Sequence, residues 1–94
     1  MSAAQPSQVT VRMWAGARAA LGVNEVGLDV PGPVSVAWVR DELVRRHPDR
    51  DRLPSVLQVC SVLVGDRPLG KDDPATVTVP PGSTVEFLPP FAGG

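Results

Sequence analysis

The sequence contains few of the side chains from which catalytic and metal sites are usually built. Among its 94 residues there are one cysteine, one histidine and only 4% aromatic residues. The single cysteine, Cys60, excludes a disulfide within the chain and leaves no thiol cluster for a metal. There is also no glycine-rich phosphate loop with its lysine and no nucleophile–base set. We therefore expect no metal site, no bound cofactor and no enzymatic activity of the chain's own.

An excess of charge and long apolar runs are absent as well. Nine basic and ten acidic residues give a net charge of −1, and the basic residues are dispersed along the chain, so we expect no nucleic-acid partner. Nowhere do about 18 consecutive apolar residues occur, and the first residues lack the basic and apolar regions of a signal peptide. These features predict a cytoplasmic protein without a membrane partner.

Alternating apolar residues predict several strands. Residues 9–14 and 25–30 alternate with a period of two, and residues 16–22 between them could form a helical turn or two. Residues 60–64, 75–79 and 84–88 continue the strand pattern. Cys60 stands in the first of these runs, which favours a buried structural thiol over a reactive one.

One helix is predicted between the second and third strands. Ser35 stands at the N-cap position ahead of Val36, Val39 and Leu43 at helical spacing, and Pro48 ends the pattern after His47. The charged residues 49–52 are expected to form a solvated loop. A sheet of about four to five strands with one main helix on one face predicts an α+β fold, the β-grasp or ubiquitin-like roll. By analogy with that fold, the first and last strands should form a central parallel pair.

The end of the sequence carries the most specific pattern. Pro89 and Pro90 cannot extend a strand ladder, so they should direct the chain away from the sheet. The last four residues can span roughly 13 Å, and Gly93 and Gly94 carry no Cβ that would obstruct a narrow channel. We predict a lead-in at residues 1–8, a ubiquitin-like domain at 9–88 and an extended tail at 89–94. The alternative is that the diglycine is only a frayed end.

The sequence resembles the MoaD/ThiS family of ubiquitin-like sulfur carriers, most closely the small subunits of molybdopterin synthase. The resemblance rests on Val11-Arg-Met-Trp-Ala-Gly-Ala-Arg18, on the helix capped by Ser35, and on the ending Val85-Glu-Phe-Leu-Pro-Pro-Phe-Ala-Gly-Gly94. Two turns depart from the family pattern, at Val64-Gly65-Asp66 and at Gly82-Ser83-Thr84.

The resemblance implies a mechanism that partner proteins carry out. An E1-like adenylyltransferase would use ATP to adenylate the Gly94 carboxylate, next to Gly93, and a sulfur donor would then convert it to a thiocarboxylate. The large subunit of molybdopterin synthase would receive the tail, and the sulfur would be used to build molybdopterin for the molybdenum cofactor. Alternatives are a protein modifier that joins Gly94 to a lysine, and a sulfur carrier for thiamine or cysteine synthesis.

A docking surface is predicted near the base of the tail. The alternation places Trp14, Leu63 and Leu88 on the sheet face away from the helix, with Arg18 at the rim. Pro90 and Phe91 are expected to join them in partner binding. The alternative is that loop residues such as Leu21 or Leu69 cover part of this surface.

Overall fold

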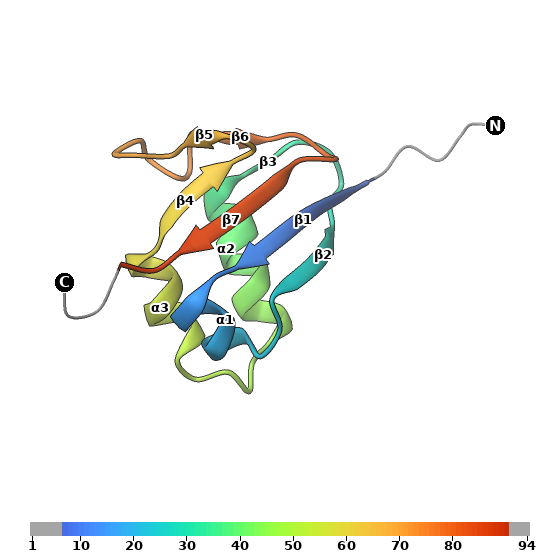
Figure 1. Cartoon of the computed structure of the whole chain (residues 1–94). Coiled ribbons are helices and arrows are strands. Elements are labelled where there is room, and N and C mark those ends of the chain that lie inside the picture. Colours follow the sequence, from blue (N-terminus) through green and yellow to red (C-terminus); the bar gives the residue numbers. More distant parts are fainter. Residues whose placement is uncertain (1–6, 91–94) are drawn as a thin grey trace.

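The computed structural model describes residues 7–90 as a sheet with helices on one face (Figure 1). The elements in chain order are β1 (Gln8–Met13), α1 (Ala15–Leu21), β2 (Glu25–Asp29), β3 (Val34–Ser35), α2 (Val36–Arg46), α3 (Leu53–Val59), β4 (Ser61–Val64), β5 (Arg67–Pro68), β6 (Thr78–Val79) and β7 (Thr84–Leu88). β1 therefore begins one residue before the predicted start, and residues 1–6 of the predicted lead-in lie outside the described part.

The main sheet has the strand order β2-β1-β7-β4-β5. The first and last strands pair in parallel at its centre, with Val11 opposite Val85 and Met13 opposite Phe87. The neighbouring pairs, β1 with β2 and β7 with β4, are antiparallel. This mixed sheet with its central parallel pair confirms the predicted β-grasp fold, and it places the last strand in the middle of the molecule.

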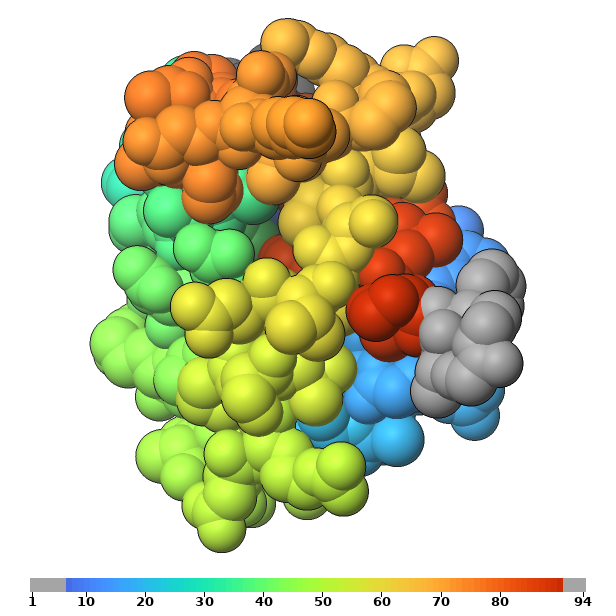
Figure 2. Space-filling view, turned by 90° about the vertical axis from the view of Figure 1, so that its left-hand side faces the viewer, coloured from blue at the N-terminus to red at the C-terminus, as the bar shows by residue number. Residues whose placement is uncertain are grey.

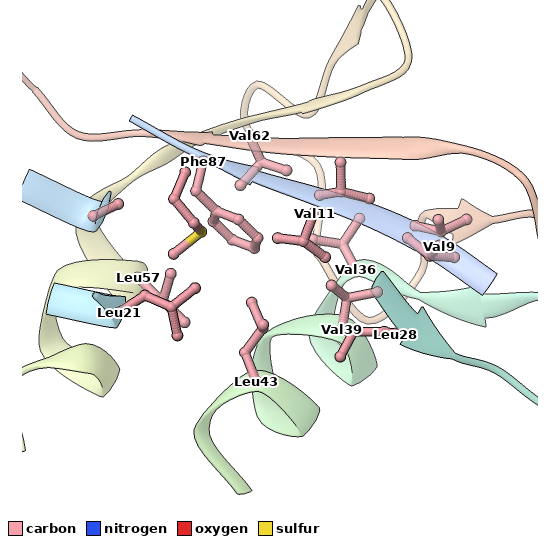
Figure 3. Packing of buried hydrophobic residues seen from close by; sticks show 14 of the residues in the cluster. Val9, Val11, Leu21, Leu28, Val36, Val39, Leu43, Leu57, Val62 and Phe87 are labelled. Atoms are coloured by element: carbon pink, nitrogen blue, oxygen red, sulfur yellow. The ribbon is translucent and has the colours of Figure 1, made fainter. Parts of the chain in front are cut away.

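The hydrophobic core lies between the sheet and the helices. The inward positions of β1 and β7 are completely buried, as Val9, Val11, Val85 and Phe87 show, because alternate side chains of a strand point to one face. Figure 3 shows the side chains of α2 and of the sheet pointing into the same layer, with Leu21 and Leu57 at one end of it. The outward positions of the same strands therefore form an open face, which none of the helices within residues 7–90 covers.

The predicted helix is confirmed with nearly the same bounds. The Ser35 side chain accepts a hydrogen bond from the backbone N–H of Trp38 at 3.0 Å, as an N-cap should, and α2 runs over Val36–Arg46 with His47 as its C-cap. Val36, Val39 and Leu43 are fully buried along one stripe of this helix. The turn or two expected at residues 16–22 is α1, whose end is capped by Gly22 in the left-handed conformation.

The prediction of a single main helix was incomplete, because a further helix, α3, follows the charged loop. Leu53 and Leu57 are both fully buried at a spacing of four, and Pro54 lies in the first turn, where a missing N–H costs nothing. α3 packs against α1 and α2. Cys60 caps α3 instead of starting the next strand, which begins at Ser61.

The prediction of a strand at residues 75–79 was wrong in its extent and in its place. Only Thr78–Val79 is extended, and it pairs with Val34–Ser35 in a separate two-stranded sheet. The Asp73 carboxylate accepts a hydrogen bond from the Ala75 N–H at 2.9 Å, and the Asp73 carbonyl accepts one from the Thr76 hydroxyl at 2.8 Å. These local bonds hold the segment in a turn, because a short polar side chain competes with the ladder. The short strand β5 had no prediction.

An ion cluster on α2 gives the fold a pH-dependent contribution. The Glu42 carboxylate accepts hydrogen bonds from Arg45 and from Arg46, whose Nε lies 2.7 Å from Oε2. These bonds, Arg45 first, lower the pKa of Glu42 to about 2 from an ordinary value of 4.5. A carboxylate with a lowered folded-state pKa stabilises the fold above its unfolded pKa, and this stabilisation is lost as the pH falls.

We therefore predict that the urea midpoint of unfolding decreases between about pH 4.5 and pH 2, and less so in Glu42→Gln. The substitution keeps the shape of the side chain and removes the charge that titrates. Asp66→Asn, at an exposed position of the turn between β4 and β5, is the control and should follow the wild type. Equal pH profiles for Glu42→Gln and the wild type would contradict this assignment.

Candidate functional site

The chain leaves the sheet from its centre. β7 ends at Leu88, and Pro89 and Pro90 continue without ladder hydrogen bonds of their own, since proline has no N–H. Pro89 Cγ lies 3.9 Å from the position that a Cβ on Gly16 would take, so the exit passes along the start of α1. Figure 2 shows the red end of β7 emerging between the yellow segment of α3 and β4 and the blue segment of α1. Phe91, Gly93 and Gly94 lie outside the described residues.

Trp14 lies directly beside this exit. Its backbone N–H donates to the Phe87 carbonyl at 3.2 Å, which continues the parallel pairing one residue past β1. The side chain is 43% exposed, one of the exposed large apolar residues of the described chain. The alternation along β1 explains this position, since Met13 before it points into the core. The predicted open-face position of Trp14 is therefore observed.

Leu63 lies on β4, across β7 from Trp14, and Leu88 is the last residue of β7 itself. Both are half-buried, and together with Pro90 they line a groove with a volume of about 560 Å³ at the β4–β5 edge. Leu69 lines the same groove. Leu21 does not take part, because it is buried in the core below α1.

Arg18 lies near Trp14 and does not line the groove that contains Leu63 and Leu88. It lies exposed on α1 and lines, with Trp14 and Asn24, a small hollow of about 120 Å³. The predicted docking residues therefore form two groups, Trp14 with Arg18 and Leu63 with Leu88 and Pro90. Leu88 and Pro90 belong to the tail exit and Trp14 lies beside it, so a partner that receives the tail can contact both groups at once.

The network of polar contacts around Trp14 was not predicted from the sequence. The indole Nε1 donates a hydrogen bond to Glu86 Oε1 at 2.9 Å. The Arg12 guanidinium carbon lies 5.3 Å from the centre of the indole ring, and Arg12 Nε lies 3.9 Å from Glu25 Oε1. Arg12, Glu25 and Glu86 occupy outward positions of β1, β2 and β7, and Trp14 directly follows β1. The register of the parallel pair, which sets Arg12 opposite Glu86, would have been the signal for it.

Cys60, the single cysteine, has the features of a structural thiol. Cys60 is half-buried, its thiol donates to the Val56 carbonyl at 3.2 Å, and burial raises the pKa of the thiol to about 11. Within residues 7–90, no group of three or more His, Cys, Asp or Glu side chains is placed to hold a metal. No helix of that part has the length and apolar character needed to cross a bilayer.

Comparison with protein-family models and with curated proteins finds no match to the sequence. Among solved structures, small archaeal modifier protein 1 (SAMP1) from Haloferax volcanii is similar at a TM-score of 0.75 and 21% identity, over 93% of this chain and 99% of that one. A putative molybdopterin converting factor subunit 1 from Pyrococcus furiosus is similar at 0.71 and 18%, over 89% and 98%.

A complex of subunits 1 and 2 of the molybdopterin-converting factor from Helicobacter pylori also contains a similar chain. Its TM-score is 0.57 at 20% identity, over 93% of this chain and 99% of that one. At such identities the likeness establishes the fold. The neighbours are ubiquitin-like modifiers and molybdopterin converting factor subunits, and this chain covers nearly their whole length.

Proposed function

We propose that the chain is a sulfur carrier of the MoaD/ThiS family. When Gly94 is the C-terminal residue, its carboxyl group is converted to a thiocarboxylate. The observation that carries the proposal is the central position of β7 beside β1. This pairing holds the base of the tail rigidly, and Pro89 and Pro90 then direct it out of the sheet. The glycines beyond can enter a narrow channel because they carry no Cβ.

The proposed chemistry converts a poor acyl group into a reactive one. An E1-like adenylyltransferase joins the Gly94 carboxylate to AMP from ATP and releases pyrophosphate. The terminal sulfur of a persulfide donor then attacks the acyl carbon and displaces AMP, which forms an acyl disulfide. A thiol attacks the donor's sulfur in this disulfide, so that the thiocarboxylate leaves and the donor and the thiol are joined in a new disulfide. The described residues contribute a rigid base for the tail and a docking surface, while the partners contribute acid–base and electrostatic catalysis.

The proposed acceptor pathway is molybdopterin synthesis, with the large subunit of molybdopterin synthase as the second partner in a cytoplasmic reaction. Two neighbours support this choice: the Pyrococcus protein named as subunit 1, and the Helicobacter subunit 1 found in complex with subunit 2. The ending Leu88-Pro-Pro-Phe-Ala-Gly-Gly94 supports it as well, because it resembles molybdopterin-synthase small subunits more than thiamine-type carriers.

Adenylation gives a direct test of the first step. The chain is incubated with its cognate activating enzyme and ATP, and pyrophosphate release is measured without any sulfur donor. We expect release that depends on the chain and that stops near one equivalent, because the adenylate stays bound. Release that is the same without the chain would count against the proposal.

A second candidate is a protein modifier that is joined through Gly94 to a lysine. The likeness to small archaeal modifier protein 1 favours it, since that neighbour has the highest TM-score of those described above. Both functions need the same activated glycine, so pyrophosphate release does not separate them. Tryptic peptide mass spectrometry of cell extracts does, because only the modifier leaves residues 72–94, the segment after the last basic residue Lys71, joined to a target lysine.

Trp14→Ala is predicted to weaken binding to the activating enzyme by about 10- to 30-fold, as an exposed aromatic anchor would. The side chain is 43% exposed and contributes little to the core, so the melting temperature should change little. Val23→Ala removes a similarly exposed apolar residue from the turn between α1 and β2 and is the control. Affinity measured by titration calorimetry should fall for Trp14→Ala alone. An unchanged affinity would remove Trp14 from the docking surface.

A further inference from the structure

Trp14 is held by contacts on two sides, at the edge and at the face of its ring. Its indole edge donates to Glu86 at 2.9 Å, and the Arg12 guanidinium lies over the ring face at 5.3 Å. Arg12 is in turn held by Glu25 across the β1–β2 pair. The hydrogen bond joins residues 72 apart in the sequence, so it forms only when β1 and β7 are in register.

From this geometry we propose that Glu86 is a positioning residue, which holds the Trp14 ring in one orientation for the activating enzyme. The inference rests on the proposed function, in which that enzyme docks beside the tail exit. Glu86 lies on β7, the strand that also carries the tail. A hydrogen bond from Trp14 to β7 therefore fixes the ring relative to the strand from which Gly94 is presented.

A ring that is already ordered loses less conformational freedom on binding than a free one. Immobilising one such side chain costs an amount that corresponds to about 2- to 10-fold in affinity. The Trp14 ring is ordered equally before and during adenylation, so it affects binding and not the chemical step. Glu86→Ala should therefore raise the KM for the chain by about 2- to 10-fold and leave kcat unchanged. Glu86→Gln keeps an acceptor oxygen at the same distance and should retain most of the affinity.

The control must change the same charge on the same face without touching Trp14. Asp29→Asn meets this requirement, because Asp29 lies at the far end of β2, where it accepts a hydrogen bond from Gln8 at 2.9 Å. It should bind and react as the wild type does. An effect of Asp29→Asn as large as that of Glu86→Ala would mean that net charge is responsible, and would overturn the proposal.

The free protein allows a measurement that does not depend on any partner. In a ¹H–¹⁵N spectrum the Trp14 indole resonance is identified by its absence in Trp14→Phe, which leaves that of Trp38. Glu86→Ala should shift the Trp14 indole resonance and speed its exchange with water several-fold, while Trp38 stays unchanged. An unchanged Trp14 resonance in Glu86→Ala would overturn the proposal, and so would an altered resonance with an unaltered KM. Failure of the proposed function would be seen elsewhere, as a wild-type chain that is never adenylated.

Discussion

Adding one bulky residue after Gly94 is expected to slow adenylation by at least about 100-fold. The added residue moves the carboxylate about 3.3–3.6 Å further along the chain, and its Cβ adds bulk to a tail that, in the proposed function, enters a narrow channel. Displacements of about 1 Å from a productive geometry can already cost about 100-fold. The measurement is the rate of pyrophosphate release at saturating ATP with wild-type and extended chains.

A third glycine after Gly94 is the matched variant for this experiment. It moves the carboxylate by the same distance and adds no Cβ, so it separates the effect of reach from the effect of bulk. We expect an intermediate rate for it. Full activity of the chain extended by leucine would contradict the requirement for an unhindered carboxylate at Gly94.

Phe87→Ala is expected to lower the free energy of unfolding by about 3–5 kcal/mol. Phe87 is completely buried on β7, where it lies opposite Met13 of β1 and Val62 of β4. The substitution removes a large apolar side chain from the layer between the sheet and α2, and the cavity it leaves cannot fully collapse. Urea unfolding monitored by circular dichroism gives the loss of stability.

Leu88→Ala, one residue further along the same strand, is the control for Phe87→Ala. Leu88 points to the open face and is only half-buried, so its loss should cost about 1 kcal/mol. The two substitutions together test which face of β7 is the core. A larger loss for Leu88→Ala than for Phe87→Ala would contradict the assignment of the faces.

Strong local signals in the sequence predicted most of the elements that position the tail. The strand at residues 84–88 and the helix capped by Ser35 have the bounds that alternation and capping indicate. α3 was not predicted because its seven residues are too few to show a helical period, and the charged loop before it gives no N-cap signal. The strand prediction was wrong at residues 75–77 because a misleading signal was present there. Their alternation is strand-like, but the hydrogen bonds to Asp73 hold them in a turn.

Part of the candidate site was predictable from the sequence, and part depends on how the sheet packs. The outward positions of Trp14, Leu63 and Leu88 follow from strand parity, which a single sequence shows. The contact of Trp14 with Glu86 depends on the register between β1 and β7, and that register is set by the packing of the whole sheet. The division of the docking residues into two groups likewise depends on the strand order, which places Leu63 of β4 across β7 from Trp14.

The central claim is tested most directly by the intact mass of the protein after incubation with its activating enzyme, ATP and a sulfur donor. Replacement of one carboxylate oxygen by sulfur adds about 16 Da, and the account predicts this gain for the wild-type chain and none for a chain that lacks Gly94. An unchanged wild-type mass under conditions in which pyrophosphate is released would contradict the sulfur-carrier function. Lysine conjugates without the heavier species would instead establish the modifier.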